Sequence, residues 1–252
     1  MAIAQPKTKL DEILDQLRPF ASNRTKIDQM TLARLKRELE RNAAVDFHMY
    51  HMLKGMLAVT EWDLETLHTS FDKALRIHNN FVTNTHYATA LQLLGKFDDA
   101  CVYARTASEL CPTDLAALER AESFAFIAGE FSLGEKCSSE LRLRAPDRKT
   151  MFDAAMSSVI NSLKANGLDE GIVKDCNKLA FDFLREKQIP YESTRFENDT
   201  LDNSVMFSIL LYPEQDGIDD LDAELGELLF EKIPNFHPGR YWVGLELGSS
   251  VE

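Results

Sequence analysis

The chain has 252 residues, is poor in cysteine, proline and glycine, and contains no apolar run of membrane-spanning length. A helix needs about 20 predominantly apolar residues to cross a bilayer, so we expect no membrane span. The N-terminal residues lack the apolar core of a signal peptide, which predicts a cytoplasmic protein. Cys101, Cys111, Cys137 and Cys176 show no paired spacing. This scatter favours reduced thiols over a disulfide framework.

Basic side chains are outnumbered, with 28 Lys and Arg against 41 Asp and Glu and a net charge of −13. This balance argues against direct nucleic-acid binding, which relies on a basic surface. Residues 197–252 hold 13 acids and 2 bases, a net charge of −11, whereas the other 196 residues hold 28 acids and 26 bases, a net charge of −2. The change in charge density predicts that the C-terminal part is a separate unit with its own surface.

Apolar residues with helical spacing dominate most of the chain. A stripe from Leu10 to Leu17 predicts a first helix that Pro19 ends, and Asp28 is placed to cap a second helix. No strand-like alternation follows until about residue 188, and helices alternate with short breaks. These breaks fall at Glu61–Trp62, Asn79–Asn80, Gly95–Lys96, Cys111–Pro112, Gly129–Glu130 and Ala145–Pro146.

Three kinds of residue recur at an offset of 34, namely Gly95 and Gly129, Phe97 and Phe131, and Pro112 and Pro146. This is the period expected of a solenoid built from two-helix units. Each unit has an apolar face that it cannot bury alone, so neighbouring units stack and share a core. Glycine supplies a turn with φ > 0, and proline stops the second helix of a unit.

The segment Gly95–Ala100, followed by Ala107 and Pro112, resembles the second half of a tetratricopeptide repeat (TPR). The resemblance covers about residues 48–148, in three units at about 48–80, 81–114 and 115–148. The first unit departs from the family pattern by an insertion around Trp62. The third has Gly134 where the family usually has alanine.

The predicted fold is mainly α, a TPR-like solenoid of helical hairpins followed by a small C-terminal α/β unit. A fourth hairpin over residues 150–187, with its turn near Gly167, matches the repeats only in shape. The predicted division is 1–46 for N-terminal helices that pack on the solenoid, 47–188 for the helical repeats and 189–252 for the acidic α/β unit.

The resemblance implies a curved stack whose concave groove is lined by the first helix of each unit. It places in a partner-binding groove the residues Met49, Met52, Met56, Val82, Thr85, Thr89, Gln92, Glu119, Arg120, Ser123 and Phe126. The three methionines share one helical face, and an exposed methionine row suits an adaptable apolar surface. The alternative is that this stripe belongs to the core.

Strand patterns begin at about residue 189. The apolar run Val205–Leu211 predicts a buried strand, the alternation over 241–247 a second strand, and Tyr191–Phe196 a weaker third. An amphipathic helix over 218–228 lies between the first two. This order predicts a β-β-α-β layer with parallel pairing across a right-handed crossover.

Acidic residues cluster where that helix begins, at Asp216, Asp219, Asp220 and Asp222. Negative charge is stabilising at a helix N-terminus. The alternative role is an acidic surface that occupies a basic groove of a partner. The order of the acids does not match a calcium-binding loop, so the cluster predicts no metal site.

The sequence contains no glycine-rich phosphate loop, nucleophile elbow or CxxC pair, and His48, His51 and His86 lack the acid spacing of a zinc site. We therefore predict no cofactor, metal or catalytic residue. The predicted function is a non-catalytic protein-protein interaction module, an adaptor or chaperone-like protein that binds a partner segment in the groove.

Two other functions stay open. One is an inhibitor, antitoxin or immunity-like protein whose acidic C-terminal unit neutralises a basic, nucleic-acid-processing target. The other is an enzyme, which would need titratable groups that converge at the junction of the hairpins and the sheet.

Overall fold

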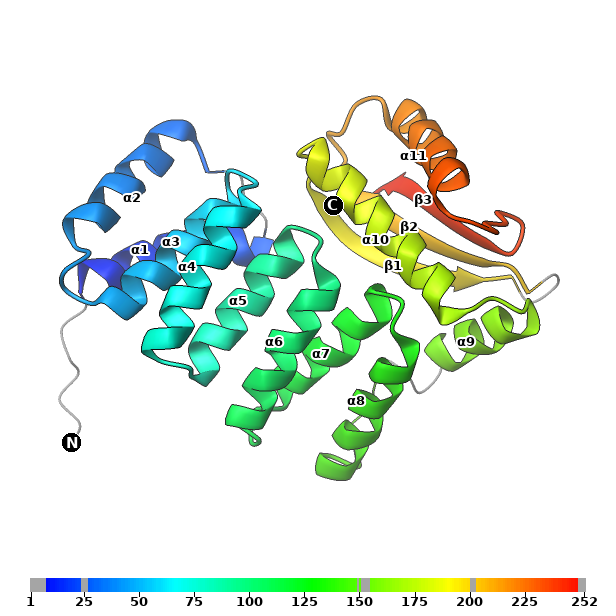
Figure 1. Ribbon diagram of the computed structural model, residues 1–252, viewed down its shortest axis with the longest axis horizontal. Coiled ribbons are helices and arrows are strands. Elements are labelled where there is room, and N and C mark those ends of the chain that lie inside the picture. Colours follow the sequence, from blue (N-terminus) through cyan, green and yellow to red (C-terminus); the bar gives the residue numbers. More distant parts are fainter. Residues whose placement is uncertain (1–7, 24–26, 149, 151–154, 200–202, 249–252) are drawn as a thin grey trace.

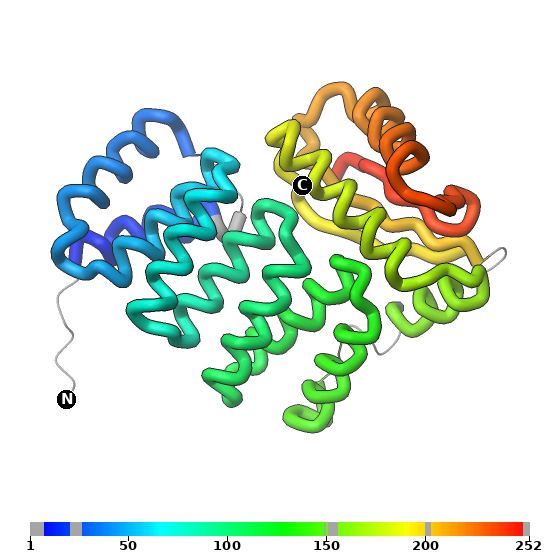
Figure 2. The backbone as a smooth tube through the Cα atoms, in the orientation of Figure 1, coloured from blue at the N-terminus to red at the C-terminus, as the bar shows by residue number. Residues whose placement is uncertain are grey.

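A row of helical hairpins leads into a small C-terminal sheet with its own helices (Figures 1 and 2). The computed structural model describes residues 8–23, 27–148, 150, 155–199 and 203–248. The predicted fold class is confirmed, because the chain is mainly helical and carries its strands only in the C-terminal part of these ranges.

The solenoid consists of antiparallel helix pairs: α1 (Lys9–Asn23), α2 (Gln29–Arg41), α3 (Phe47–Val59), α4 (Leu64–Ile77), α5 (Phe81–Leu93), α6 (Phe97–Leu110), α7 (Leu115–Ile127) and α8 (Phe131–Arg144). The helix breaks fall where the sequence predicts them. The Asp28 carboxylate accepts the Thr31 N–H at 2.9 Å, so the predicted cap of α2 is confirmed. Asp63 and Asn80 cap α4 and α5 in the same way.

The predicted end of the first helix at Pro19 is wrong, because α1 continues through this proline to Asn23. A proline inside a helix costs about 3 kcal/mol, since it removes one backbone hydrogen bond and clashes with the preceding turn. The apolar face of α1 offsets this cost. Leu10, Ile13 and Leu17 are fully buried, and Phe20, one residue beyond the proline, still packs against the core.

Two glycines allow an aromatic ring to lie directly on a helix backbone within a hairpin. A Cβ atom on Gly55 would lie 2.5 Å from the Phe71 ring, and one on Gly134 would lie 2.6 Å from the Phe126 ring. Real Cβ atoms do not approach a ring this closely. The Phe126 ring therefore explains why residue 134 departs from the alanine of the TPR pattern.

The C-terminal unit is a three-stranded sheet of order β1-β2-β3. Its elements are β1 (Tyr191–Asn198), β2 (Val205–Leu211), α11 (Ile218–Lys232) and β3 (Tyr241–Leu247). β1 pairs with β2 in antiparallel orientation, and β2 pairs with β3 in parallel across α11. The predicted β-β-α-β layer is therefore confirmed.

The two helices before the sheet, α9 (Ala155–Ala165) and α10 (Glu170–Glu186), differ from the predicted fourth hairpin in where they pack. The turn at Gly167 is present, with φ of +65°. However, α9 packs on β1 and β2, and α10 packs on β3 and α11. The physical reason is the apolar face of the sheet. The hydroxyl of Tyr241 donates to Asn177 of α10 at 2.5 Å, and Phe207 contacts Phe181.

α10 also runs along two turns of the solenoid, one between α5 and α6 and the other between α7 and α8 (Figure 1). Gly95 and Gly129 occupy equivalent turns, with φ of +72° and +80°, and both lie against α10. A Cβ atom on Gly95 would lie 2.8 Å from Phe181, and one on Gly129 would lie 2.8 Å from the Lys174 backbone nitrogen. Seven residues of α-helix span about 10.5 Å. One two-turn step of α10 thus matches one repeat of the solenoid.

Polar contacts join the same two turns to α10. Lys96 pairs with Asp182 at 3.6 Å, and Lys174 pairs with Glu130. The Asn177 side-chain amide donates to the Ile127 carbonyl at 2.9 Å, which satisfies a carbonyl at the end of α7. The sheet is therefore attached to the side of the solenoid along α10.

This attachment predicts that alanine is tolerated differently at two glycines that share a left-handed backbone. Gly167→Ala has open space around the new methyl group, so the free energy of unfolding should fall by only about 1–2 kcal/mol, the cost of alanine in the left-handed conformation. Gly129→Ala should lose at least about 1 kcal/mol more, because its methyl group would clash with backbone atoms of α10. Urea unfolding of the two variants checks this, and equal losses would contradict the docking of α10 on this turn.

Candidate functional site

A cleft of about 490 Å³ lies where the solenoid meets β1. Its walls come from α5, α6, α7, α9 and β1. The lining residues are Gln92, Phe97, Ser123, Phe126, Ile127, Met156, Tyr191, Glu192, Ser193, Thr194 and Phe196. Aromatic and aliphatic side chains thus alternate there with small polar ones, at the junction of hairpins and sheet.

Helices α5, α6 and α7 of the solenoid form one side of this cleft, and β1 and α9 form the other. Tyr191 is buried and lines it. Its hydroxyl donates to the Gln92 carbonyl, and its ring centroid lies 5.1 Å from that of Phe181. The first residue of β1 is therefore held in place by both the solenoid and α10.

The outer edge of β1 presents backbone groups that do not pair with β2. The Asp199 N–H, just after β1, donates to the Ser204 carbonyl at 2.9 Å. On β2, the Val205 N–H donates to the Arg240 carbonyl beside β3, so the odd-numbered residues of β2 direct their backbone groups at β3. Because hydrogen-bonded and non-hydrogen-bonded pairs alternate in an antiparallel ladder, the odd-numbered residues of β1 direct their backbone N–H and C=O groups at β2. Thr194 and Phe196 direct their N–H and C=O groups outward, and both residues line the cleft.

The opposite edge of the sheet packs against α11. On β3, the outward N–H of Leu245 donates to the Asp222 carboxylate of α11 at 2.8 Å. Burial raises the pKa of Asp222, and the bond from Leu245 opposes that rise. Asp222 is half-buried, and one of its carboxylate oxygens is engaged by β3, so this residue differs from the other three acids of the cluster. Asp216, Asp219 and Asp220 are exposed.

The predicted groove residues divide between the cleft and other places. Gln92, Ser123 and Phe126 line the cleft, but Phe126 is only 1% exposed and forms part of its floor. Met52 and Met56 are buried, so the core interpretation holds for these two, and they offer no surface to a partner. Met49 is half-buried. The aliphatic methionine side chains fill the space among the first helices.

The remaining predicted residues lie farther toward the N-terminal ends of α5 and α7. Val82 and Arg120 are exposed, whereas Thr85 and Thr89 are half-buried. Glu119 pairs with Arg148 at 2.5 Å. These residues share the helices of the cleft but do not line it.

Sequence reasoning missed the residues that β1 and α9 bring to the cleft, namely Met156 and residues 191–194 and 196. Phe196 contacts Phe207 of the sheet and Phe131 of α8, with centroids 4.6 and 6.1 Å apart. The strand pattern at 191–196 was the available signal, but it does not indicate which element its outer edge faces.

The titratable groups that line the cleft, in the described part of the chain, are the Glu192 carboxyl and the Tyr191 hydroxyl. Glu192 is exposed, and Tyr191 is committed to its bond with Gln92. Three cysteines are buried elsewhere: burial raises the pKa of Cys137 to about 11 and those of Cys101 and Cys176 to about 12. These thiols stay protonated at neutral pH.

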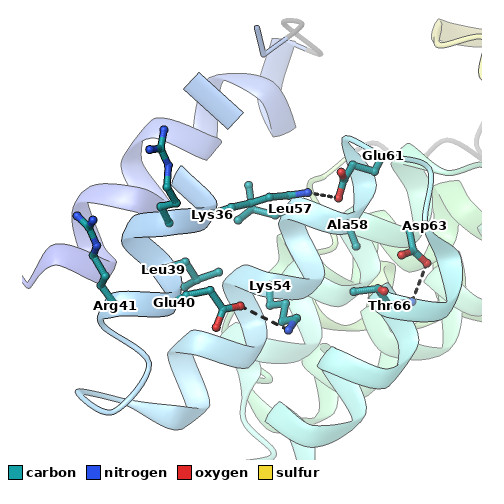
Figure 3. A pocket seen from close by; sticks show the side chains of 11 residues that line it. Lys36, Leu39, Glu40, Arg41, Lys54, Leu57, Ala58, Glu61, Asp63 and Thr66 are labelled. Atoms are coloured by element: carbon teal, nitrogen blue, oxygen red, sulfur yellow. Dashed lines mark hydrogen bonds and ion pairs between the residues drawn. The ribbon is translucent and has the colours of Figure 1, made fainter. Parts of the chain in front are cut away.

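A second hollow, of about 560 Å³, lies between α2, α3 and α4 (Figure 3). Four of its charged side chains form two ion pairs: Lys36 contacts Glu61 at 2.5 Å, and Lys54 contacts Glu40 at 3.6 Å. Asp63 is occupied as the cap of α4 (Figure 3). These internal pairs make the hollow a weaker candidate than the cleft.

The three histidines considered as ligands, His48, His51 and His86, have different surroundings. The His48 ring nitrogen Nε2 lies 2.7 Å from the Thr83 hydroxyl. His86 is partly buried on α5, and burial lowers its pKa to about 4, with smaller contributions from Arg120 and Arg18. No group of three His, Cys, Asp or Glu side chains among the described residues is arranged to hold a metal ion.

Comparisons with family models, with curated proteins and with solved structures find no match. The geometry of the chain itself therefore carries the functional argument. Within the described ranges, no helix has both the length and the apolar character required to cross a membrane.

The lowered pKa of His86 predicts a pH-dependent stability. Its pKa of about 4 lies below the ordinary value of 6.5, so the unfolded chain binds this proton more readily between these values. His86 should therefore reduce the free energy of unfolding by about 1–2 kcal/mol from pH 7 to pH 5. Urea titrations at both values should show a smaller loss in His86→Gln. The matched variant His237→Gln, at an exposed loop position, should behave as the parent does.

Proposed function

We propose that this protein is a non-catalytic binding module that captures an extended segment of a partner protein in the cleft between α7 and β1. One observation carries the proposal: the outward backbone groups of Thr194 and Phe196 border a cleft with an apolar floor. An exposed strand edge is a template for a further strand.

In this binding mode, the partner backbone hydrogen bonds to Thr194 and Phe196, and its side chains point alternately to the two faces of the sheet. One set of side chains would enter the cleft toward Phe126 and Met156. The other set would lie beside Ser193 and Arg195 on the solvent-exposed face. Main-chain bonds supply affinity, and the apolar floor selects the side chain that enters.

The hairpins serve as the second wall of this cleft, which agrees with a TPR-like scaffold whose task is recognition. Two observations favour binding over catalysis: among the described residues the lining offers one exposed carboxyl, Glu192, and the hydroxyl of Tyr191 is already bonded. General acid-base catalysis requires titratable groups directed at one reacting atom. Unpaired buried thiols at Cys101 and Cys137 suit the reducing cytoplasm, where we place the protein.

A proline substitution tests the role of the strand edge. Peptides selected from a random phage-displayed library on the immobilised full chain serve as probes. Thr194→Pro removes an N–H that points away from β2, so the sheet should stay intact while peptide affinity falls at least about tenfold. Arg195→Pro removes an N–H directed at β2 and should destabilise the fold itself. Isothermal titration and urea unfolding separate the two effects.

Two further measurements make this test decisive. Bound peptide should slow hydrogen exchange at the amides of Thr194 and Phe196. Ser123→Trp should block binding by filling the cleft from α7, whereas Ser139→Trp, at an exposed position of α8, should leave it unchanged. The proposal would be refuted if neither Thr194→Pro nor Ser123→Trp changed the peptide affinity. It would also be refuted if the library yielded no binder.

A further inference from the structure

A second surface, remote from the cleft, lies on the outer face of α11. A hollow of about 610 Å³ forms there between the helix and the side chain of Trp242. We call it the α11 hollow; its lining residues are Asp222, Ala223, Gly226, Glu227, Phe230, Glu231 and Trp242. Ala223 is small and exposed, whereas Gly226 is buried and lets the Trp242 indole lie on the helix, because a Cβ atom on Gly226 would touch the ring at 3.4 Å.

Phe230 stands beside this hollow and is 59% exposed. Its ring meets Phe236 edge-on at 5.4 Å, which fixes the side chain without covering it. Scattered exposed apolar residues are ordinary, but here an aromatic side chain, an indole and two small residues share one hollow. This arrangement offers an apolar side chain of a partner a place to insert.

The rim of the α11 hollow is acidic. Glu227 and Glu231 are exposed one helical turn apart, and Asp219 and Asp220 extend the same charge toward the start of α11. Glu231 contacts Lys232 at 3.1 Å. Within the described ranges, no ion pair joins Glu227, Asp219 or Asp220 to a base. Residues 197–252 contain only 2 bases, so the chain offers this rim little neutralisation.

We infer that the α11 hollow binds a basic amphipathic helix of a partner protein. The small, exposed side chain of Ala223 lets a second helix approach closely, and the partner's apolar stripe would contact Phe230 and Trp242. Lysine or arginine side chains beside that stripe would pair with Glu227 and Glu231, whose spacing matches basic residues four apart. Complementary charge favours this partner over an acidic or neutral one. The inference does not depend on the function proposed for the cleft.

A labelled amphipathic peptide of leucine and lysine, whose apolar residues form one helical stripe, serves as the probe. Fluorescence anisotropy with the full chain should show binding at least about tenfold tighter than that of a scrambled peptide with the same composition. Phe230→Ala should weaken binding about tenfold. Raising NaCl from about 0.1 M to about 1 M should also weaken it, and Glu227→Lys should reduce that salt dependence.

A charge-matched variant separates the site from general attraction to an acidic protein. Glu65→Lys, at an exposed position of α4, changes the net charge from −13 to −11, as Glu227→Lys does, and should leave the affinity nearly unchanged. Equal binding of the scrambled peptide, equal loss in Glu65→Lys, or no effect of Phe230→Ala would each overturn the inference. Ser123→Trp should have no effect on this probe, so failure at the cleft and failure at the α11 hollow are distinguishable.

Discussion

The packing of α10 against the turns of the solenoid is the constraint on which the other features depend. Gly95 and Gly129 recur with the 34-residue period of the hairpins, and both turns lie against one helix. The match holds because two turns of α-helix cover about the distance between neighbouring repeats. The opposite side of α10 packs on the sheet, where Asn177 meets Tyr241. A single helix thus fixes the sheet relative to the solenoid.

This placement gives the two edges of the sheet different environments. The edge at β3 packs against α11, whose Asp222 carboxylate accepts the outward N–H of Leu245. The edge at β1 borders the cleft, where Thr194 and Phe196 present their backbone groups. Open edges carry a risk of aggregation. Residues of α7 form the facing wall of the cleft, so this edge is flanked by the solenoid.

The two surfaces rely on different physical interactions. The cleft combines backbone hydrogen bonding with an apolar floor, both of which change little with salt, whereas the α11 hollow adds unpaired carboxylates whose attraction salt screens. Glu227 and the aromatic ring of Phe230 stand on a helix that is far in sequence from the solenoid repeats. A module with both surfaces could hold two partner segments at once, and their contributions would then combine through effective concentration.

Local patterns were sufficient for the element order, the repeat period, the Asp28 cap and the parallel crossover, because periodicity, capping and turn chemistry act over a few residues. Local patterns could not show that burial outweighs the cost of Pro19, that Met52 lies in the core, or that Asp222 bonds to the edge of β3. Local patterns also could not predict the cleft, because β1 and α7 lie far apart in sequence. Only tertiary packing decides which strand edge and helix face meet, since that outcome depends on long-range contacts through α10.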